Sequence, residues 1–302
     1  MQTFLPYPSF LASAQVLDRQ RLGKQRVETL QILRALELPD YGWQSHPVVR
    51  MWRGRTPALV RYGLDCVRVW TGRGHGDSTA DQIAEFAPWV RELSQADLQR
   101  DSLLPSWLGD ERLHRSHRSQ LIAKDPEFYR PLFPDSPEGL DYFWPEQDSI
   151  TTVSNPHSHR FLWVLRPESE NALGRAVLTG AIGFGPAADV PADASAGDLA
   201  ALRELQTNPS RRPSRALRAL ADFVEAVHTG DDIGVLISGG QSLLIGQVMG
   251  PYTFAPRDTA GLTHRRAVSW DRIIARSTMP RPSALQDVRP LFSVSWDPEV
   301  AH

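Results

Sequence analysis

The chain has 302 residues, 41% of them hydrophobic, which is the composition of a folded protein with one or two domains. No apolar run approaches the roughly 20 residues of a membrane-spanning helix, and MQTFLPYPSF lacks the pattern of a signal peptide, so we expect a cytoplasmic protein. The single cysteine, Cys66, excludes a disulfide within the chain and a thiolate-rich metal site, and its apolar neighbours predict a small core residue.

The net charge of -2 conceals an uneven distribution of charged residues along the chain. Residues 1–75 contain 11 Lys and Arg against 5 Asp and Glu, whereas residues 76–110 contain 2 against 7. This segregation favours a surface that faces a polyanion, although arginines on solvated helix faces would give the same counts.

Helical spacing of apolar residues predicts an all-α domain over residues 1–147. The predicted helices span residues 14–37, 56–72, 79–100 and 113–124, with Pro and Gly between them. After YFWPEQDSI the chain changes to short β-rich runs around one helix, SRALRALADFVEAVHTG. These runs are RFLWVL, AVLTGAIGFG, DIGVLIS, SLLIGQVMG and AVSW. The sequence therefore predicts a multidomain protein whose residues 148–302 form an α+β domain with a small bent sheet or barrel, in which GPAADVPADASAGD is a loop.

One face of the predicted helix 14–37 is unusually polar. Arg21, Lys24, Gln25 and Glu28 follow the spacing i, i+3, i+4 and i+7, which places them on a common face. Two cations, an amide and a carboxylate in one small volume suit a site that grips phosphates while the carboxylate acts. An exposed face with ordinary Lys–Glu pairs has the same spacing.

Several motifs of the first half resemble the pyrimidine-dimer DNA glycosylase family, in its bacterial branch. They are FLPYPSFLASAQVLDRQRLGKQRVETLQIL, HPVVRMWRG, HRSHRSQLIAKDPEFYRPLF and YFWP, and the resemblance covers about residues 1–145. The founding member of this family is a small all-α phage repair enzyme. A glutamate on its first long helix is essential for cleaving the N-glycosidic bond, and Glu28 matches that position. The polar face thereby becomes a candidate active site. The catalytic candidates are Glu28, Lys24, Arg21, Gln25 and His46, and we expect no cofactor.

The nucleophile of such a site is left open by the sequence. Cleavage of a glycosidic bond builds positive charge on the sugar, which a carboxylate stabilises. The phage family attacks with its processed N-terminal amine, whereas this sequence starts Met-Gln, and Gln is too large a second residue for ready removal of Met1. The three candidates are water activated by Glu28, which we favour here, the amine of Met1, and Lys24.

The histidines of the first half are possible metal ligands, but the sequence does not favour a metal site. His114 and His117 stand i, i+3, but no third ligand is indicated, and the interleaved arginines suit phosphate contacts better. A core or helix-capping role competes with catalysis for His46. We expect these residues to contact DNA: Arg19, Arg26, Arg53, His114, His117, Arg118 and Lys124.

The second half resembles PUA-like modules related to EVE domains, which accompany restriction enzymes and read modified bases. The run DDIGVLISGGQSLLIGQVMGPYTFAPRDTAGLTHRRAVSW carries this resemblance, together with RFLWVLRP and GAIGFGP before it. Such modules bind a flipped base between aromatic walls. The resemblance implies these base-binding candidates: Trp163, Phe184, Tyr252, Phe254, His264, Arg266 and Trp270. A place in the domain core is the alternative for each of the aromatic residues.

The two resemblances together lead to a hypothesis about substrate. A glycosylase for ultraviolet dimers finds its lesion through distortion and hardly needs a module that reads bases. We therefore expect a DNA glycosylase that removes a modified base, such as hydroxymethylated or glucosylated cytosine, from double-stranded phage DNA as antiphage defence. The alternatives are a pyrimidine-dimer repair glycosylase with AP lyase activity and a non-catalytic reader of modified nucleic acid.

Overall fold

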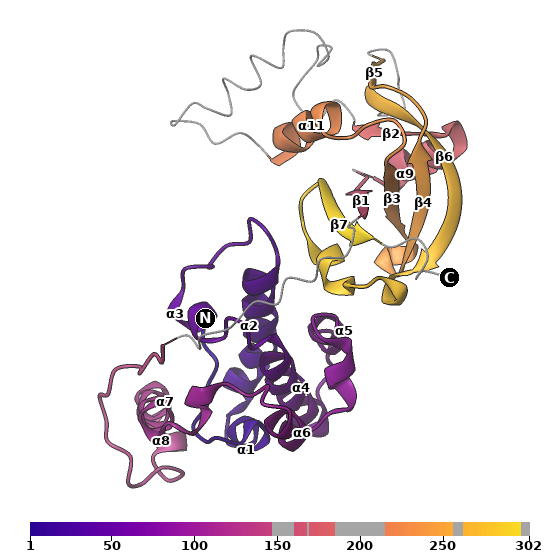
Figure 1. Ribbon diagram of the computed structural model, residues 1–302. Helices are drawn as coiled ribbons and strands as arrows, with labels where there is room; N and C mark the ends of the chain where they lie inside the picture. Colours follow the sequence, from indigo (N-terminus) through magenta and orange to yellow (C-terminus); the bar gives the residue numbers. More distant parts are fainter. Residues whose placement is uncertain (147–159, 168, 185–214, 256–261, 297–302) are drawn as a thin grey trace, which may run out of the picture. The chain divides into compact units, whose positions relative to one another are not determined.

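The computed structural model describes residues 1–146, 160–167, 169–184, 215–255 and 262–296 (Figure 1). The chain divides into two compact units, Met1–Asn155 and Pro156–His302. The domain boundary that the sequence predicts near residue 147 lies outside the described residues, as does the predicted loop GPAADVPADASAGD.

All regular elements described in the first unit are helices, as predicted. Its elements in chain order are α1 (Phe10–Gln15), α2 (Arg19–Glu37), α3 (Pro47–Met51), α4 (Thr56–Gly72), α5 (Ala80–Ala84), η1 (Pro88–Glu92), α6 (Gln95–Arg100), η2 (Ser106–Gly109), α7 (Glu111–Lys124) and α8 (Pro126–Tyr129). None of the described helices is long and apolar enough to cross a membrane.

Two of the predicted helices are wrong as continuous elements. The chain breaks between α1 and α2 because Asp18 adopts an extended conformation and its side chain accepts a hydrogen bond from the Arg21 amide at 3.0 Å, which starts a new helix. The region 79–100 consists of α5, η1 and α6, because Pro88 begins η1 and Ser94 forms a capping box with Asp97 at the start of α6. The predicted helix 56–72 is confirmed as α4.

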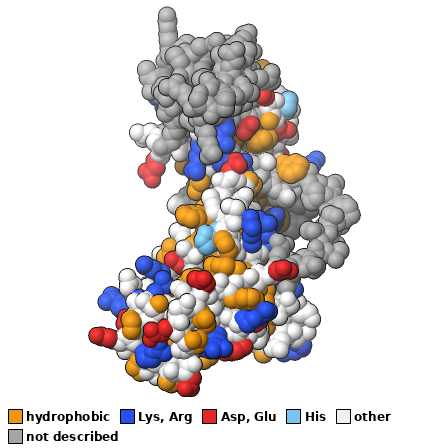
Figure 2. Space-filling model, turned by 90° about the vertical axis from the view of Figure 1, so that its left-hand side faces the viewer, with side chains coloured by type: hydrophobic (Ala, Val, Ile, Leu, Met, Phe, Trp, Pro, Cys, Tyr) orange, Lys and Arg blue, Asp and Glu red, His pale blue; other side chains and the backbone are white. Residues whose placement is uncertain are grey.

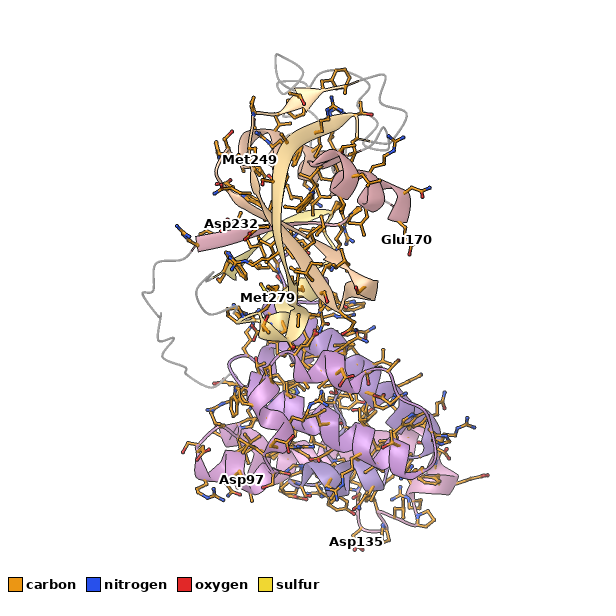
Figure 3. The ribbon with its side chains drawn as sticks, turned by 90° about the vertical axis from the view of Figure 1, so that its right-hand side faces the viewer. Asp97, Asp135, Glu170, Asp232, Met249 and Met279 are labelled. Atoms are coloured by element: carbon orange, nitrogen blue, oxygen red, sulfur yellow. The ribbon has the colours of Figure 1, made fainter. Side chains whose placement is uncertain are left out.

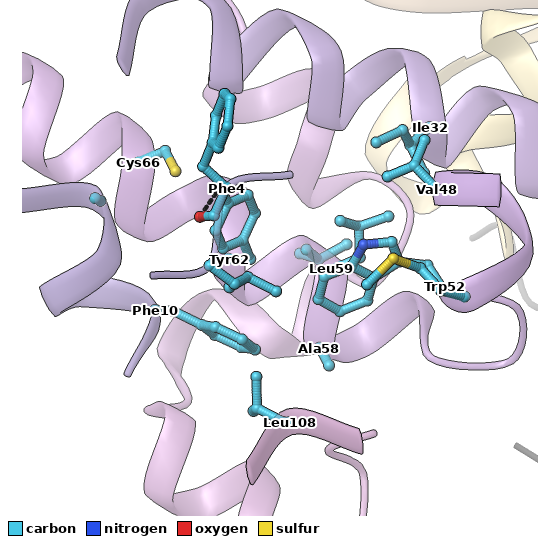
Figure 4. Packing of buried hydrophobic residues seen from close by; sticks show 14 of the residues in the cluster. Phe4, Phe10, Ile32, Val48, Trp52, Ala58, Leu59, Tyr62, Cys66 and Leu108 are labelled. Atoms are coloured by element: carbon cyan, nitrogen blue, oxygen red, sulfur yellow. Dashed lines mark hydrogen bonds between the residues drawn. The ribbon is translucent and has the colours of Figure 1, made fainter. Parts of the chain in front are cut away.

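The core of the helical unit forms where α2 packs on α4. Gly63 permits this close approach, since a Cβ there would lie 2.7 Å from the Thr29 Cγ2 atom. Buried aromatic side chains pack next to this contact between the two helices (Figure 4). Among them, the Tyr62 hydroxyl donates a hydrogen bond to the Phe4 carbonyl oxygen at 2.9 Å. Cys66 is fully buried in this cluster, which confirms the predicted core role, and burial raises the pKa of its thiol.

The second unit combines helices with a mixed sheet. Its elements are β1 (Arg160–Leu165), α9 (Glu170–Thr179), β2 (Ala181–Phe184), α11 (Arg215–Glu225), β3 (Asp232–Ile237), η4 (Ser238–Gly240), β4 (Ser242–Val248), β5 (Thr253–Phe254), β6 (His264–Ala275), η5 (Arg276–Thr278), η6 (Pro282–Gln286) and β7 (Leu291–Trp296). In Figure 3, Glu170 marks the start of α9, Asp232 the start of β3, and Met249 the residue after β4.

Of the two predicted forms, bent sheet or barrel, the described strands form an open sheet. The strand order is β2-β6-β4-β3-β1-β7, and β5 also pairs with β6. β1 and β3 are parallel, whereas β6 runs antiparallel to β2, β4 and β5. The long strand β6 curves along the sheet (Figure 1), and its pairing with β4 shifts in register between Ile245 and Gly246.

One predicted β-rich run is partly helical. In AVLTGAIGFG, the first four residues end α9, and AIGF alone forms β2. Ser169 caps the start of α9 by accepting a hydrogen bond from the Ala172 amide, and Gly180 ends the helix at φ 58°. These caps favour a helix over a strand for residues whose apolar character alone suits either.

Candidate active site

A pocket of about 490 Å³ lies beside α2 in the helical unit, within the size range of small-molecule sites. Five separate stretches of the described chain line it. The lining residues are Met1, Gln2, Phe4, Gln20, Arg21, Lys24, Gln25, Glu28, His46, Lys124, Tyr142 and Trp144.

The polar face predicted from sequence faces this pocket. Arg21, Lys24, Gln25 and Glu28 all line it, and Gln25 is only 1% exposed. Within the described part of the chain, no ion pair joins Lys24 to Glu28. Arg21 instead pairs with Asp18 at 2.8 Å. The alternative of a solvated helix face with Lys–Glu pairs therefore does not describe this face.

The amino-terminal segment delivers its first residues to Glu28. The Gln2 amide donates to Glu28 Oε2 at 2.9 Å. Burial lowers the pKa of His46, the nearby N-terminal ammonium group lowers it further, and Glu28 opposes both effects. Burial raises the pKa of Tyr142 to about 12, with Glu28 contributing in the same direction. Met1, Glu28 and His46 thus line one pocket, close enough for their charges to interact.

Buried polar side chains hold this segment in place. Gln25 accepts from the Phe4 amide at 2.8 Å and donates to the Gln2 carbonyl oxygen at 3.1 Å. The Leu5 amide donates to His117 Nδ1 at 2.9 Å. These bonds satisfy backbone groups that burial would otherwise leave unpaired, so they fix the position of the segment relative to α2.

The prediction that His114 and His117 contact DNA is wrong for this structure. Both side chains are 0% exposed, because their ring nitrogens bind the backbone of the buried amino-terminal segment. His114 Nδ1 lies 2.7 Å from the Leu5 carbonyl oxygen, and burial together with the charge of His114 lowers the pKa of His117 to about 3. The described residues also contain no group of three or more His, Cys, Asp or Glu that could hold a metal ion.

His46 has the helix-capping role that the sequence allowed, and its ring also lines the pocket. Its Nδ1 atom accepts from the Val48 amide at 3.2 Å and thereby caps α3. Capping fixes the ring orientation without removing it from the site.

The cations predicted to contact DNA lie in different environments. Arg19, Arg53 and Lys124 are exposed, and Lys124 lines the pocket. Arg26 pairs with Asp77, and its guanidinium lies 4.3 Å from the Trp70 ring centre. On the face shown in Figure 2, basic and acidic side chains are interspersed over the helical unit.

Arg118 has a structural contact as well as a partly exposed side chain. It donates to the Pro6 carbonyl oxygen at 2.8 Å and pairs with Glu111. Arg118 therefore helps to hold the chain that leads out of the pocket, in addition to any contact with DNA.

Sequence reasoning assigned no site role to five residues that line the pocket: Gln2, Phe4, Gln20, Tyr142 and Trp144. The last two belong to the motif YFWP, which supported the resemblance. Trp144 meets the His46 ring edge to face at 6.2 Å, and Tyr142 lies 5.5 Å from Trp144. The clustering of three aromatic residues at 142–144 is the sequence signal by which Tyr142 and Trp144 could have been found.

The base-binding candidates of the second unit separate into two groups, and the first belongs to the core. Phe184 is buried edge to face against Phe223 at 5.4 Å. Arg266 is buried and donates to the Phe223 and Val224 carbonyl oxygens at 3.1 and 3.0 Å. Folding accounts for these contacts.

The other base-binding candidates are four half-buried aromatic residues and His264, which packs beside two of them. Tyr252 and Phe254 are half-buried beside the fully buried His264, whose Nδ1 atom lies 2.8 Å from the Tyr252 hydroxyl. Trp163 and Trp270 are half-buried, and their indole N–H groups donate to Asp231 and to the Ala176 carbonyl oxygen. Tyr252 and Phe254 are thus the candidates whose rings combine partial exposure with close packing on another candidate.

The buried His117 predicts a pH dependence of stability. Its pKa is lowered from 6.5 to about 3, so the unfolded chain binds the proton more tightly than the folded one. This contribution to stability is complete above pH 6.5 and is lost as the pH falls toward 3. Urea unfolding between pH 7 and 5 should show the unfolding free energy falling by up to about 1.4 kcal/mol per pH unit and per proton.

A matched pair of variants isolates this effect. His117→Asn keeps an acceptor for the Leu5 amide and should flatten the slope, although His46 adds a smaller dependence of the same sign. The control His75→Asn removes a histidine of the same unit whose ring packs on Trp70. Equal slopes in the two variants would contradict the assignment to His117.

The comparisons with known proteins agree with this geometry in the first unit. Residues 1–83 match the family model described as pyrimidine dimer DNA glycosylase, and the match includes all of α2. Residues 179–281 match a model described as a domain of unknown function (DUF8426). No curated protein and no solved structure matches the chain. The first match supports the DNA glycosylase family, which implies DNA binding, for the part of the chain that holds Glu28.

Proposed function

We propose that the helical unit is a DNA N-glycosylase in which Glu28 is the catalytic carboxylate. The observation that carries the proposal is that Glu28, Lys24 and Met1 line one pocket, formed largely by the segment that matches the glycosylase family model. A base inside a duplex is inaccessible, so a glycosylase takes its target nucleotide out of the stack into a pocket of this kind.

The charged groups around Glu28 suit two requirements of the reaction, namely stabilising positive charge on the sugar and holding the flanking phosphates. Positive charge develops on the sugar as the base leaves, and a carboxylate at that position stabilises it. Arg21 is held by Asp18 at 2.8 Å and by the Lys124 carbonyl oxygen at 3.0 Å, so its guanidinium is already oriented. The exposed ammonium groups of Lys24 and Lys124 reach the same pocket and are suited to the flanking phosphates.

We propose the amine of Met1, which lines the pocket together with Glu28, as the nucleophile, in place of the water that the sequence analysis favoured. The uncharged amine forms a bond to the sugar C1′ atom as the bond from C1′ to the base breaks. The base keeps the electron pair and takes a proton from solvent, while the amine nitrogen loses a proton to Glu28. Opening of the sugar ring then gives a Schiff base, from which elimination of the 3′ phosphate nicks the strand and hydrolysis restores the amine. This route gives the protein AP lyase activity.

Replacing Glu28 tests the role of the carboxylate. Glu28→Gln keeps an oxygen that can accept from the Gln2 amide but removes the negative charge. We expect base release in single-turnover assays to slow by at least about 100-fold, with the Kd for DNA nearly unchanged. The control Glu92→Gln alters an exposed carboxylate on η1 and should behave as wild type. Full activity of Glu28→Gln would overturn the assignment, and DNA binding by a wild-type protein that releases no base would indicate a non-catalytic reader.

Trapping with borohydride tests the nucleophile. After intact-mass analysis has established the N-terminus of the protein, reduction during turnover should link DNA covalently to the peptide that begins at Met1. Lys24→Met should still be trapped, whereas extension by Gly-Ser ahead of Met1 should abolish trapping. A DNA adduct on Lys24 would contradict the proposal, and base release without any adduct would favour water activated by Glu28.

We further propose that the second unit reads a modified base, so that the substrate is foreign DNA carrying hydroxymethylated or glucosylated cytosine. The resemblance of this unit to modules that read modified bases supports the proposal, as does the grouping of Tyr252 and Phe254 on His264. Aromatic faces bind any base, and polar groups next to them can test its substituents. Under this proposal, residues 1–147 excise the base and residues 148–302 select it. The competing substrate is a pyrimidine dimer, as the description of the matching family indicates.

Two DNA substrates separate these alternatives. The full-length protein is incubated with phage DNA that carries hydroxymethylated or glucosylated cytosine and with ultraviolet-irradiated unmodified DNA. We expect free base and alkali-labile sites from the phage DNA. Tyr252→Ala should reduce the yield of both, although this variant keeps the catalytic candidate Glu28. Release from irradiated DNA alone would contradict the modified-base substrate and support repair of dimers.

A further inference from the structure

Trp43 is an exposed aromatic residue in the loop between α2 and α3. Its side chain is 65% exposed, although indole is a large apolar group that proteins usually bury in part. The neighbouring Gly42 has open space around it, since a Cβ there would meet nothing within 4 Å. Most of the Trp43 side chain therefore lies outside the packing of the described helical unit.

The loop nevertheless holds Trp43 in a defined conformation. Its backbone has φ 73°, a left-handed value that a bulky residue rarely adopts. The Trp43 carbonyl oxygen accepts from the His46 amide at 2.8 Å. Gln44 donates to the Leu38 carbonyl oxygen at 3.2 Å, and Arg53 donates to the Gln44 carbonyl oxygen at 3.1 Å. A strained and exposed aromatic residue that several hydrogen bonds hold in place is typical of a binding position.

A series of ring contacts connects Trp43 to the pocket. Its ring meets His46 edge to face at 5.9 Å, and His46 meets Trp144 at 6.2 Å. His46 and Trp144 both line the pocket that contains Glu28. Trp43 therefore stands beside the pocket, in ring contact with a residue that lines it.

We propose that Trp43 stacks on a nucleobase adjacent to the target nucleotide in double-stranded DNA. The inference rests on the proposed glycosylase function, because removal of one nucleotide from the stack exposes the faces of its neighbours. An indole ring replaces the lost stacking, and every base offers a suitable face. The exposed Arg50 and Arg53, which follow on α3 and just after it, supply cations for the phosphates beside that base.

The test uses a duplex in which an abasic-site analogue replaces the target nucleotide and 2-aminopurine is its neighbour. Stacking quenches 2-aminopurine, so wild-type protein should reduce its emission on binding. Trp43→Ala should lose this quenching and bind the duplex about 10-fold more weakly, the effect of one base–aromatic stack. Trp43→Phe, which keeps an aromatic face, should retain most of both effects, whereas Trp43→Leu, which is apolar without such a face, should behave like Trp43→Ala.

Trp89→Ala is the matched control, since Trp89 is 52% exposed on η1 of the same unit and does not line the pocket. It should bind and quench as wild type. Equal behaviour of Trp43→Leu and Trp43→Phe, or wild-type quenching by Trp43→Ala, would overturn the inference. All variants are compared by thermal unfolding, and a Trp43→Ala protein that melts earlier but binds normally would assign the ring to folding and also overturn it.

The duplex has no glycosidic bond at the target position, so this result does not depend on base release. If no DNA releases a base while Trp43→Ala still weakens binding, the proposed catalytic function fails and the stacking role stands. If base release is observed and Trp43→Ala binds as wild type, the stacking role fails and the catalytic function stands.

Discussion

The helical unit depends on the burial of its own amino-terminal segment. Residues 2–5 run through the interior, where each backbone amide and carbonyl group requires a partner. Gln25 supplies two of these bonds, to Phe4 and Gln2, and His117 supplies another to Leu5. This requirement explains why Gln25, His114 and His117 are buried polar residues. Removing one of them leaves a buried backbone group unpaired, which costs about 1–3 kcal/mol.

The same arrangement creates the site. The amino-terminal segment forms one wall of the pocket and α2 another, and the Gln2 amide joins them by its hydrogen bond to Glu28. α2 can serve in this way because its faces differ in chemistry. Leu22 and Leu33 are fully buried and hold the helix, while Lys24 and Glu28 remain accessible. A carboxylate held between a rigid helix and a buried segment is oriented before any ligand binds, which is what electrostatic catalysis requires.

The second unit shows how folding and binding compete for the same residue types. Phe184 and Arg266 look like parts of a base-reading surface in the sequence, but one packs in the core and the other satisfies buried carbonyl groups. An aromatic or basic residue in a strand can either pack in the core or bind a base. Which of the two it does depends on its exposure, which is set by strands from elsewhere in the chain that pair with its own strand. Tyr252 and Phe254 remain half-exposed because they lie at and beside the short strand β5.

The sequence by itself determined the features that depend on local spacing. It predicted the shared face of Arg21, Lys24, Gln25 and Glu28, the extent of α4, and the helical and mixed classes of the two units, because side-chain periodicity reports secondary structure directly. Even the break before α2 has a local cause, the cap formed by Asp18. Only the tertiary structure decided that Gln2 meets Glu28, 26 residues away, and that His117 binds Leu5, 112 residues away. Such pairings depend on the packing of whole helices, which no spacing within one segment encodes, and for that reason His114 and His117 resembled surface cations in the sequence and are interior supports in the fold.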